Sequence, residues 1–305
     1  MKKIFYIAAI LLVGSIVITY VFYLSYRNER LGELESRSQL IQTSHGPIEY
    51  QLSGESGPVI LYLHGIPGGY DAGFSWPGYR VLSVSRSGYL RTPITVGRTP
   101  DEQARAYAAL LDSLGIGSVV VMGASGGGPP AIAFTAMYPK RTLGFLGLFP
   151  ISQSWHFLYE APSFSRSDFW LWAVANASNN SFGRKVLGLF VQGEGAKRWI
   201  SSGLSSLEEV WPPSLRANGL SNDIAQYKSL DLLNGREITV PTLIIHGTAD
   251  IDVPYSQSEI LTANISGSVL HPIEGGTHQM FSTRSEEIIP VMAEFLITVT
   301  HSLQE

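Results

Sequence analysis

The sequence contains no cysteine among its 305 residues, and only 15% of its residues are charged. The missing cysteine excludes disulfide frameworks and cysteine-ligated zinc sites. The formal net charge is -4, without a basic stripe that could follow phosphates, so nucleic acid is not expected as a partner. Hydrophobic residues make up 45% of the chain, which is enough for one large core. The chain also lacks internal repeats and low-complexity segments, so we expect an ordinary globular domain.

Charged residues are absent from a long run near the N-terminus, residues 4–24. As a helix this run is about 30 Å long, which matches the hydrocarbon layer of a bilayer. We therefore predict an uncleaved transmembrane signal-anchor in residues 1–24 that binds the lipid bilayer, followed by a polar tether in residues 25–37. A cleaved signal peptide is the alternative, but its apolar core is usually shorter and no small-x-small exit site follows here.

The orientation of this helix is not decided by counting positive charges. Lys2 and Lys3 precede the run, while Arg27, Arg30 and Arg37 follow it. A very short basic start followed at once by the span is typical of an exported signal-anchor. We therefore expect a single-pass protein of the cell membrane whose main domain lies outside the cytoplasm.

The rest of the chain alternates between strand patterns and helix patterns. Residues 38–43 and 48–52 alternate in polarity, as an antiparallel strand pair does, and continuous apolar runs typical of strands buried on both faces follow. A capping box at Thr99 to Glu102 opens a helix to about Leu114, and the closing helix is expected to bury Ile289, Met292, Phe295 and Leu296. This alternation predicts an α/β fold with a mostly parallel, eight-stranded sheet flanked by helices. These predicted strands lie at 58–63, 79–84, 118–122, 143–149 and 268–272, with one more that begins at 240 and ends in the loop that carries Asp250.

One stretch, residues 151–235, breaks the alternation with aromatic, loop-rich helical pieces. We predict that it is a helical lid inserted after the sixth strand, between core segments 38–150 and 236–305. Its aromatic side chains either form the small core of the lid or, in part, face a cleft. They are Trp155, Phe157, Tyr159, Phe164, Phe169, Trp170, Trp172, Trp199 and Trp211.

The run at 118–122 enters a sharp turn, Gly123-Ala124-Ser125-Gly126-Gly127, and residues 129–137 then have the pattern of a helix. In a G-x-S-x-G turn the serine adopts a strained backbone conformation, and the glycines remove Cβ atoms where strand and helix approach. The hydroxyl of Ser125 is a useful nucleophile only if a base and an acid lie nearby. A phosphate-binding turn is the alternative, which the absence of Gly-Lys-Ser/Thr and G-x-G-x-x-G disfavours.

Two further polar groups, Asp250 and His278, follow the seventh and eighth predicted strands. Open α/β sheets place their sites along the carboxyl edge, so we expect both side chains to lie near Ser125. The chain order Ser, Asp, His is that of the α/β-hydrolase triad.

Four motifs in this order resemble the α/β-hydrolase superfamily, in particular its capped serine hydrolases such as esterases and proline iminopeptidases. The resemblance covers residues 38–303, with the lid matched by position and composition alone. The motifs are His64-Gly65-Ile66-Pro67-Gly68-Gly69, Gly123-Ala124-Ser125-Gly126-Gly127, His246-Gly247-Thr248-Ala249-Asp250 and Gly275-Gly276-Thr277-His278.

This resemblance implies a role for each matched residue. Ser125 would be the nucleophile, His278 its general base, and Asp250 the acid that orients the imidazole. The backbone N–H groups of Ile66 and Gly126 would form the oxyanion hole. Asp252 is the alternative acid, but the spacing His-Gly-x-x-Asp favours Asp250; His64 and His246 are expected to be structural.

The sequence departs from the family at Ser85, where many relatives have an aspartate. We expect a different local hydrogen bond there and no effect on the triad. Dehalogenases and epoxide hydrolases of this fold use an aspartate nucleophile, and a serine at position 125 argues against both activities.

The function expected from these features is a carboxylesterase-like serine hydrolase that cleaves a small, largely apolar acyl compound. No cofactor or metal is implied, and the oligomeric state is not indicated. A proline iminopeptidase-like aminopeptidase is an alternative, because Glu160, Glu194, Glu208 and Glu209 could hold a substrate amine. A non-catalytic, membrane-tethered binding protein is another, although it would have no need to keep the whole triad.

Overall fold

The computed structural model describes residues 2–156, 163–179, 181–190, 210–231 and 235–301. The chain forms two compact units. We call Met1–Ser38 with Ala161–Pro213 the helical unit, and Gln39–Glu160 with Ser214–Glu305 the core unit. Of the aromatic and acidic residues discussed for the lid, Phe157, Tyr159, Glu160, Glu194, Trp199, Glu208 and Glu209 lie outside the described residues.

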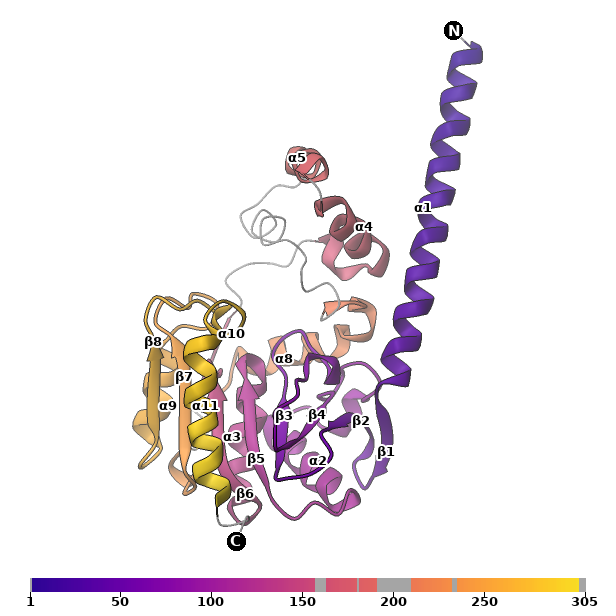
Figure 1. Cartoon of the computed structure of the whole chain (residues 1–305). Coiled ribbons are helices and arrows are strands. Elements are labelled where there is room, and N and C mark those ends of the chain that lie inside the picture. The colour runs from indigo at the N-terminus through magenta and orange to yellow at the C-terminus, as the bar shows by residue number, and fades with distance from the viewer. Residues whose placement is uncertain (1, 157–162, 180, 191–209, 232–234, 302–305) are drawn as a thin grey trace. The chain divides into compact units, whose positions relative to one another are not determined.

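The core unit is built on one eight-stranded sheet with strand order β1-β2-β4-β3-β5-β6-β7-β8 (Figure 1). The pairs β1–β2 and β2–β4 are antiparallel, and all later pairs are parallel. The predicted α/β sheet is thus confirmed, and its strand ends differ from the predicted ends by no more than two residues. The strands are β1 (Gln39–Thr43), β2 (Gly46–Ser53), β3 (Val59–Leu63), β4 (Arg80–Val84), β5 (Val119–Ala124), β6 (Thr142–Leu148), β7 (Thr242–Gly247) and β8 (Val269–Ile273).

Helices cover both faces of this sheet, which is why its strands read as continuous apolar runs. Along β3, Leu61 and Leu63 belong to a buried cluster with side chains of α2 (Pro100–Ser113), α3 (Gly128–Met137) and α9 (Ser256–Asn264). Ile60, between them, belongs to a second cluster with α11 (Ser285–Thr300). Figure 1 shows α11 in front of the sheet. Successive side chains on a strand point to opposite faces, so each strand serves both layers.

The other described helices of the core unit are short. They are the α-helices α8 (Ala217–Tyr227) and α10 (Met280–Thr283), with 3₁₀ turns at Tyr70–Ala72, Ile94–Val96, Ser125–Gly127, Pro139–Arg141 and Gly235–Glu237.

The two predicted helix features of the core unit have different outcomes. The capping box of α2 is present: Thr99 Oγ1 accepts from the Glu102 N–H at 3.2 Å, and the Glu102 carboxylate accepts from the Thr99 N–H at 3.1 Å. The prediction that α11 buries Ile289 is wrong, because this side chain is 44% exposed. The buried residues of this helix include Ile288, Met292 and Leu296, whose spacing of four places them on the one helix face that meets the sheet.

The helical unit contains α1 (Lys2–Ser36), α4 (Asp168–Ser178) and α5 (Ser181–Phe190), with 3₁₀ turns at Ser163–Arg166 and Pro213–Leu215, the second of which reaches into the core unit. The predicted span and polar tether form one continuous helix of 35 residues. Among the described residues α1 is the one helix long and apolar enough to cross a membrane, and its most apolar stretch has no buried side chain. Only Arg37 and Ser38 separate its last turn from β1.

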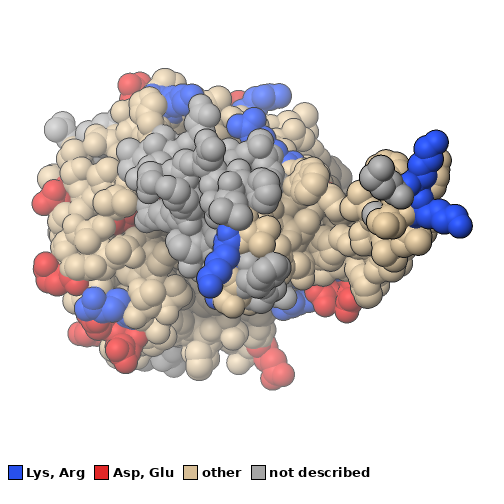
Figure 2. All heavy atoms as spheres, turned by 90° about the horizontal axis from the view of Figure 1, so that it is seen from above, with Lys and Arg blue, Asp and Glu red and all other residues tan. Residues whose placement is uncertain are grey.

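The described charged side chains are spread singly or in small groups over the face seen in Figure 2. The described charged side chains therefore form no single acidic or basic patch on that face.

The tight packing of the Ser125 turn leads to a prediction about stability. A Cβ added at Gly127 would lie 2.1 Å from the backbone oxygen of Leu63, so the main chain would have to move. We expect Gly127→Ala to lower the free energy of unfolding by about 1–3 kcal/mol, as overpacking does. Urea unfolding in detergent, followed by tryptophan fluorescence, measures it.

Gly117→Ala is the matched control, because a Cβ there meets nothing within 4 Å. It should leave the free energy of unfolding unchanged or slightly higher, since alanine restricts the unfolded chain. Equal losses in the two variants would contradict the packing argument.

Candidate active site

Ser125 stands at the tip of the turn that joins β5 to α3. Its φ of 50° lies in the left-handed region, which is strained for a residue with a side chain. The turn is possible because a Cβ at Gly123 would lie 2.6 Å from the Cβ of Ala131, so only glycine allows strand and helix to approach so closely. The Ser125 side chain is held at the carboxyl end of β5, and the residue is 8% exposed.

The structure brings Ser125, His278 and Asp250 together. The imidazole Nε2 of His278 lies 3.2 Å from Ser125 Oγ, and its Nδ1 lies 2.7 Å from Asp250 Oδ2. Ser125 follows β5, Asp250 follows β7 and His278 follows β8, so the three residues meet at one edge of the sheet. The ring of Phe149 stands edge-on to the imidazole, with 4.7 Å between centroids, and limits how the imidazole can tilt.

The carboxylate of Asp250 is held by several donors. Its Oδ1 accepts from the backbone N–H groups of Asp252 and Val253 at 2.9 and 3.0 Å. Burial acts to raise the pKa of this carboxyl, but hydrogen bonds from His246, His278 and Val253 outweigh it and hold the pKa below its usual value. It is therefore the Asp250 carboxylate, and not that of Asp252, that lies ionised beside His278.

The two residues predicted to supply oxyanion-hole amides lie against each other beside Ser125. Gly126 directly follows the serine, and a Cβ added to it would lie 2.3 Å from Cγ1 of Ile66. On the same loop a Cβ at Gly65 would lie 3.2 Å from the Cβ of Ser125. The backbone after β3 and the backbone after Ser125 thus approach the hydroxyl from two sides.

The remaining histidines near the site are buried and hydrogen-bonded. Burial, and then the charge of Arg86, lowers the pKa of His64 well below its usual value, so this imidazole is neutral. Its Nε2 accepts from the Arg86 N–H at 3.0 Å, so Nδ1 carries the proton and donates to Gly65 O. His246 lies within hydrogen-bond distance of Ser258 Oγ and Val253 O, at 2.6 and 3.0 Å. Both side chains support loops, as the sequence predicts.

An ion pair beneath the site was not predicted from the sequence. Arg86, after β4, pairs with Asp223 on α8 at 2.5 Å, and both side chains are fully buried. Arg86 also donates to the backbone oxygens of His64 and Gly65, at 2.8 and 3.3 Å. Burial raises the pKa of Asp223, while Arg86 and Tyr89 donate to its carboxylate and favour the ionised form.

A second group from α8 reaches the other side of Ser125. Tyr227 donates from its hydroxyl to Gly126 O at 2.7 Å and lies 3.4 Å from Arg86 Nη1. One buried network therefore contacts both backbone segments of the expected oxyanion hole. The sequence signal available for it was Arg86, a charged residue two positions after the end of β4; Asp223 and Tyr227 belong to no motif.

The departure at Ser85 is compensated by a neighbouring strand. Ser85 Oγ donates to the carboxylate of Glu49, on β2, at 2.9 Å and accepts from the Tyr70 N–H at 3.1 Å. Glu49 also accepts from Arg91 at 2.7 Å. The carboxylate of Glu49 thus holds this loop in place of an aspartate at position 85. The local hydrogen bond differs, as predicted.

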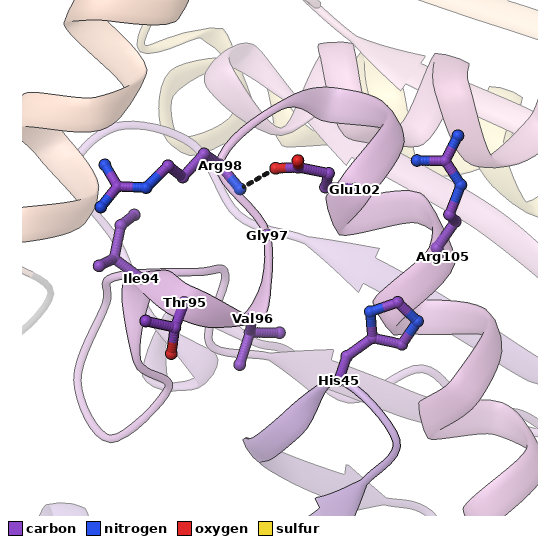
Figure 3. Close-up of a pocket in the computed structure, with 8 residues that line it drawn as sticks. All are labelled: His45, Ile94, Thr95, Val96, Gly97, Arg98, Glu102 and Arg105. Carbon is purple, nitrogen blue, oxygen red and sulfur yellow. Dashed lines mark hydrogen bonds between the residues drawn. The ribbon is translucent and has the colours of Figure 1, made fainter.

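A hollow of about 500 Å³ lies elsewhere on the core unit, between the β1–β2 turn and the start of α2 (Figure 3). Its one carboxylate, Glu102, is occupied by the amides of Arg98 and Thr99 at the start of α2. No member of the group around Ser125 lines it, so we assign it to the support of α2 and not to catalysis. It is lined by His45, Ile94, Thr95, Val96, Gly97, Arg98, Glu102 and Arg105.

Comparison with known proteins agrees with the observed fold. The profile of the alpha/beta hydrolase fold family matches residues 58–284. The chain belongs to the α/β-hydrolase family. Among solved structures, an α/β hydrolase fold protein from Nakamurella multipartita is 31% identical and superposes with a TM-score of 0.65. The match covers 80% of this chain and 92% of the Nakamurella chain.

Two curated relatives align with most of this α/β hydrolase. The uncharacterized hydrolase YcgS of Bacillus subtilis is 25% identical over 260 residues, which are 78% of this chain and 90% of the relative. A non-heme chloroperoxidase of Streptomyces lividans is 28% identical over 270 residues, 79% of this chain and 92% of the relative. The hydrolase class is thereby established, while the names of the relatives span more than one activity.

The contact of Tyr227 with Gly126 predicts that this tyrosine is a positioning residue. Tyr227→Phe removes the hydrogen bond to Gly126 O, so we expect kcat for an activated ester to fall about five- to tenfold with little change in KM. Steady-state kinetics on a short p-nitrophenyl ester measures it.

Tyr107→Phe is the control, because Tyr107 is equally buried and donates one hydrogen bond, to Gln103 at 2.9 Å. Both variants should lose about 1 kcal/mol of stability. Only Tyr227→Phe should lose activity; equal kinetic effects would reduce Tyr227 to a purely structural role.

The lowered pKa of Asp250 predicts a pH dependence of stability. Because this pKa is lower in the folded than in the unfolded chain, the stabilisation is present above about pH 4 and lost as the pH falls toward the folded-state value. The free energy of unfolding should therefore exceed that of Asp250→Asn at neutral pH, and the difference should shrink in acid. Denaturant curves of both proteins across this range test it, and a constant difference would contradict an ionised Asp250.

Proposed function

We propose that this α/β hydrolase is a membrane-anchored serine hydrolase that cleaves the ester bond of a small, largely apolar acyl compound. The observation that carries the proposal is the pair of contacts of His278, 3.2 Å to Ser125 Oγ and 2.7 Å to Asp250 Oδ2. A serine hydroxyl hydrogen-bonded to an imidazole, which is in turn hydrogen-bonded to a carboxylate, is the arrangement that activates a serine nucleophile.

In the first half of the reaction, Ser125 Oγ attacks the ester carbonyl carbon while its proton passes to His278 Nε2. Asp250 holds the proton of Nδ1 and stabilises the imidazolium. The tetrahedral intermediate then expels the alcohol, which takes the proton from Nε2, and the acyl group remains on Ser125. In the second half, water gives its proton to His278 and attacks the acyl carbon, and Ser125 recovers that proton as the carboxylic acid leaves.

The negative oxygen of both intermediates would be held by the N–H groups of Ile66 and Gly126. Donors of this kind typically contribute about 10²–10³ in rate each. The approach of Ile66 to Gly126, and the buttressing of Gly126 by Tyr227, support this assignment.

Two further parts of the proposal rest on the sequence. The length and low polarity of α1 support a single membrane span. The very short basic start, Lys2 and Lys3, favours a main domain outside the cytoplasm. The aromatic composition of residues 151–235 supports a lid and an apolar substrate, in line with the low charge of the chain.

The deciding experiment is labelling with a fluorophosphonate, which reacts only with an activated serine. We expect the full-length protein in detergent to be labelled and Ser125→Ala not to be. His278→Ala should abolish both labelling and hydrolysis of short p-nitrophenyl esters while the protein stays folded by circular dichroism.

Ser113→Ala is the control, since this serine donates to Ala109 O on the exposed end of α2, and it should be labelled normally. Labelling of Ser125→Ala at the wild-type level, or near-normal hydrolysis by His278→Ala, would overturn the assignment. Hydrolysis of proline anilides in preference to esters would favour an aminopeptidase.

A further inference from the structure

The helical unit joins α1 to α4 through a cluster of aromatic rings. Tyr23 on α1 stands perpendicular to Phe169 on α4, with 5.2 Å between ring centroids, and lies 5.5 Å from Trp172. One turn further, Tyr26 lies 5.1 Å from Trp211. Tyr23, Trp172 and Trp211 are all buried, so this is a packed core and not a chance contact.

Two hydrogen bonds hold the N-terminal end of α4 in place. Trp211 donates from its indole N–H to Asp168 O at 3.0 Å, and Ser167 caps the helix by accepting from the Trp170 N–H. With Phe169 and Trp172 turned into the cluster, Trp170 faces outward and is 58% exposed. Its ring lies 5.2 Å from Phe169, which itself lies 6.1 Å from Tyr20.

The position of this cluster along α1 is informative. The helix carries no charge from Ile4 until Arg27, so the bilayer that it is proposed to span ends near Tyr23 and Tyr26. Tyrosine and tryptophan concentrate at the boundary between hydrocarbon and water. Because α4 packs on α1 at Tyr23, the aromatic residues of α4, Trp170 included, lie at the same boundary.

Chain connectivity links α4 to the catalytic edge. The stretch that contains α4 leaves the sheet after the carboxyl end of β6. The neighbouring strands on either side, β5 and β7, carry Ser125 and Asp250 at their own carboxyl ends. The segment anchored to α1 therefore emerges from the sheet edge at which the three catalytic candidates meet.

We propose that α4 lies in the interfacial layer of the membrane spanned by α1, and that the substrate is an amphiphilic acyl lipid of that membrane. The substrate part rests on the proposed ester hydrolysis. A long acyl chain gains about 0.8 kcal/mol per buried CH₂ in the bilayer, so such an ester is concentrated there and scarce in water. An enzyme with its inserted segment at the interface meets this substrate where it resides.

The absence of cysteine makes a direct test possible. In full-length protein reconstituted in phosphatidylcholine–phosphatidylglycerol vesicles, Trp170→Cys is labelled with an environment-sensitive fluorophore, and Ile297→Cys serves as control. Ile297 is 62% exposed on α11 of the core unit. Emission from position 170 should be blue-shifted and quenched by nitroxide-labelled lipid, while emission from position 297 should not. Equal, unquenched emission from both positions would overturn the interfacial placement.

The substrate is tested by a ratio of rates in the same vesicles. The measured quantity is the rate of hydrolysis of a long-chain acylglycerol in the bilayer divided by the rate for a water-soluble p-nitrophenyl ester. Trp170→Ser should lower this ratio severalfold, and Ile297→Ser should leave it unchanged. An unchanged ratio in Trp170→Ser, or a wild-type protein that cleaves the soluble ester but no bilayer ester, would overturn the lipid substrate.

These outcomes separate the two proposals. If the fluorophosphonate does not label Ser125, the hydrolase and the lipid substrate both fail, while quenching at position 170 would still establish the interfacial helix. If Ser125 is labelled but position 170 is not quenched, the hydrolase stands and the membrane placement of α4 is wrong.

Discussion

The close approach of β5 to α3 is the constraint on which the site depends. It forces Ser125 into a left-handed conformation and admits only glycine at the positions where strand, helix and the loop after β3 meet. Such strain persists only where the surroundings over-determine it. Here the surroundings are the sheet beneath the turn, the loop of Gly65 and Ile66 on one side, and Tyr227 on the other. The position of the Ser125 hydroxyl at the carboxyl edge of the sheet is thus a consequence of packing.

Few residues of this protein are charged, and some of them are buried in the core unit. Arg86 and Asp223 are fully buried, as is the Glu49 carboxylate that receives Ser85 and Arg91. Burying a charge is costly unless a partner and further hydrogen bonds compensate, and both clusters supply them. The Arg86 cluster holds the backbone after β3, at His64 and Gly65, and the Glu49 cluster holds the segment after β4. The buried charges therefore organise loops and are not themselves placed to react.

The helical unit ties the long N-terminal helix to the segment inserted between β6 and β7. Here α1 continues as helix beyond its apolar stretch, and its tyrosines form a common core with α4 and Trp211. These rings bury one another, so the aromatic residues described here form a packed core.

The sequence by itself determined the sheet, the long apolar helix and the three residues that meet at the carboxyl edge. Each follows from a local pattern: apolar runs bounded by turns, an uncharged stretch, and a G-x-S-x-G turn. The face of the closing helix was misassigned at Ile289, since two adjacent apolar residues do not reveal which one faces the sheet. Only the tertiary structure decided that Asp223 pairs with Arg86, that Glu49 receives Ser85, and that Tyr23 packs on Trp172. Contacts between segments far apart in the chain leave no periodic signature in either segment, so they arise only when the fold brings the segments together.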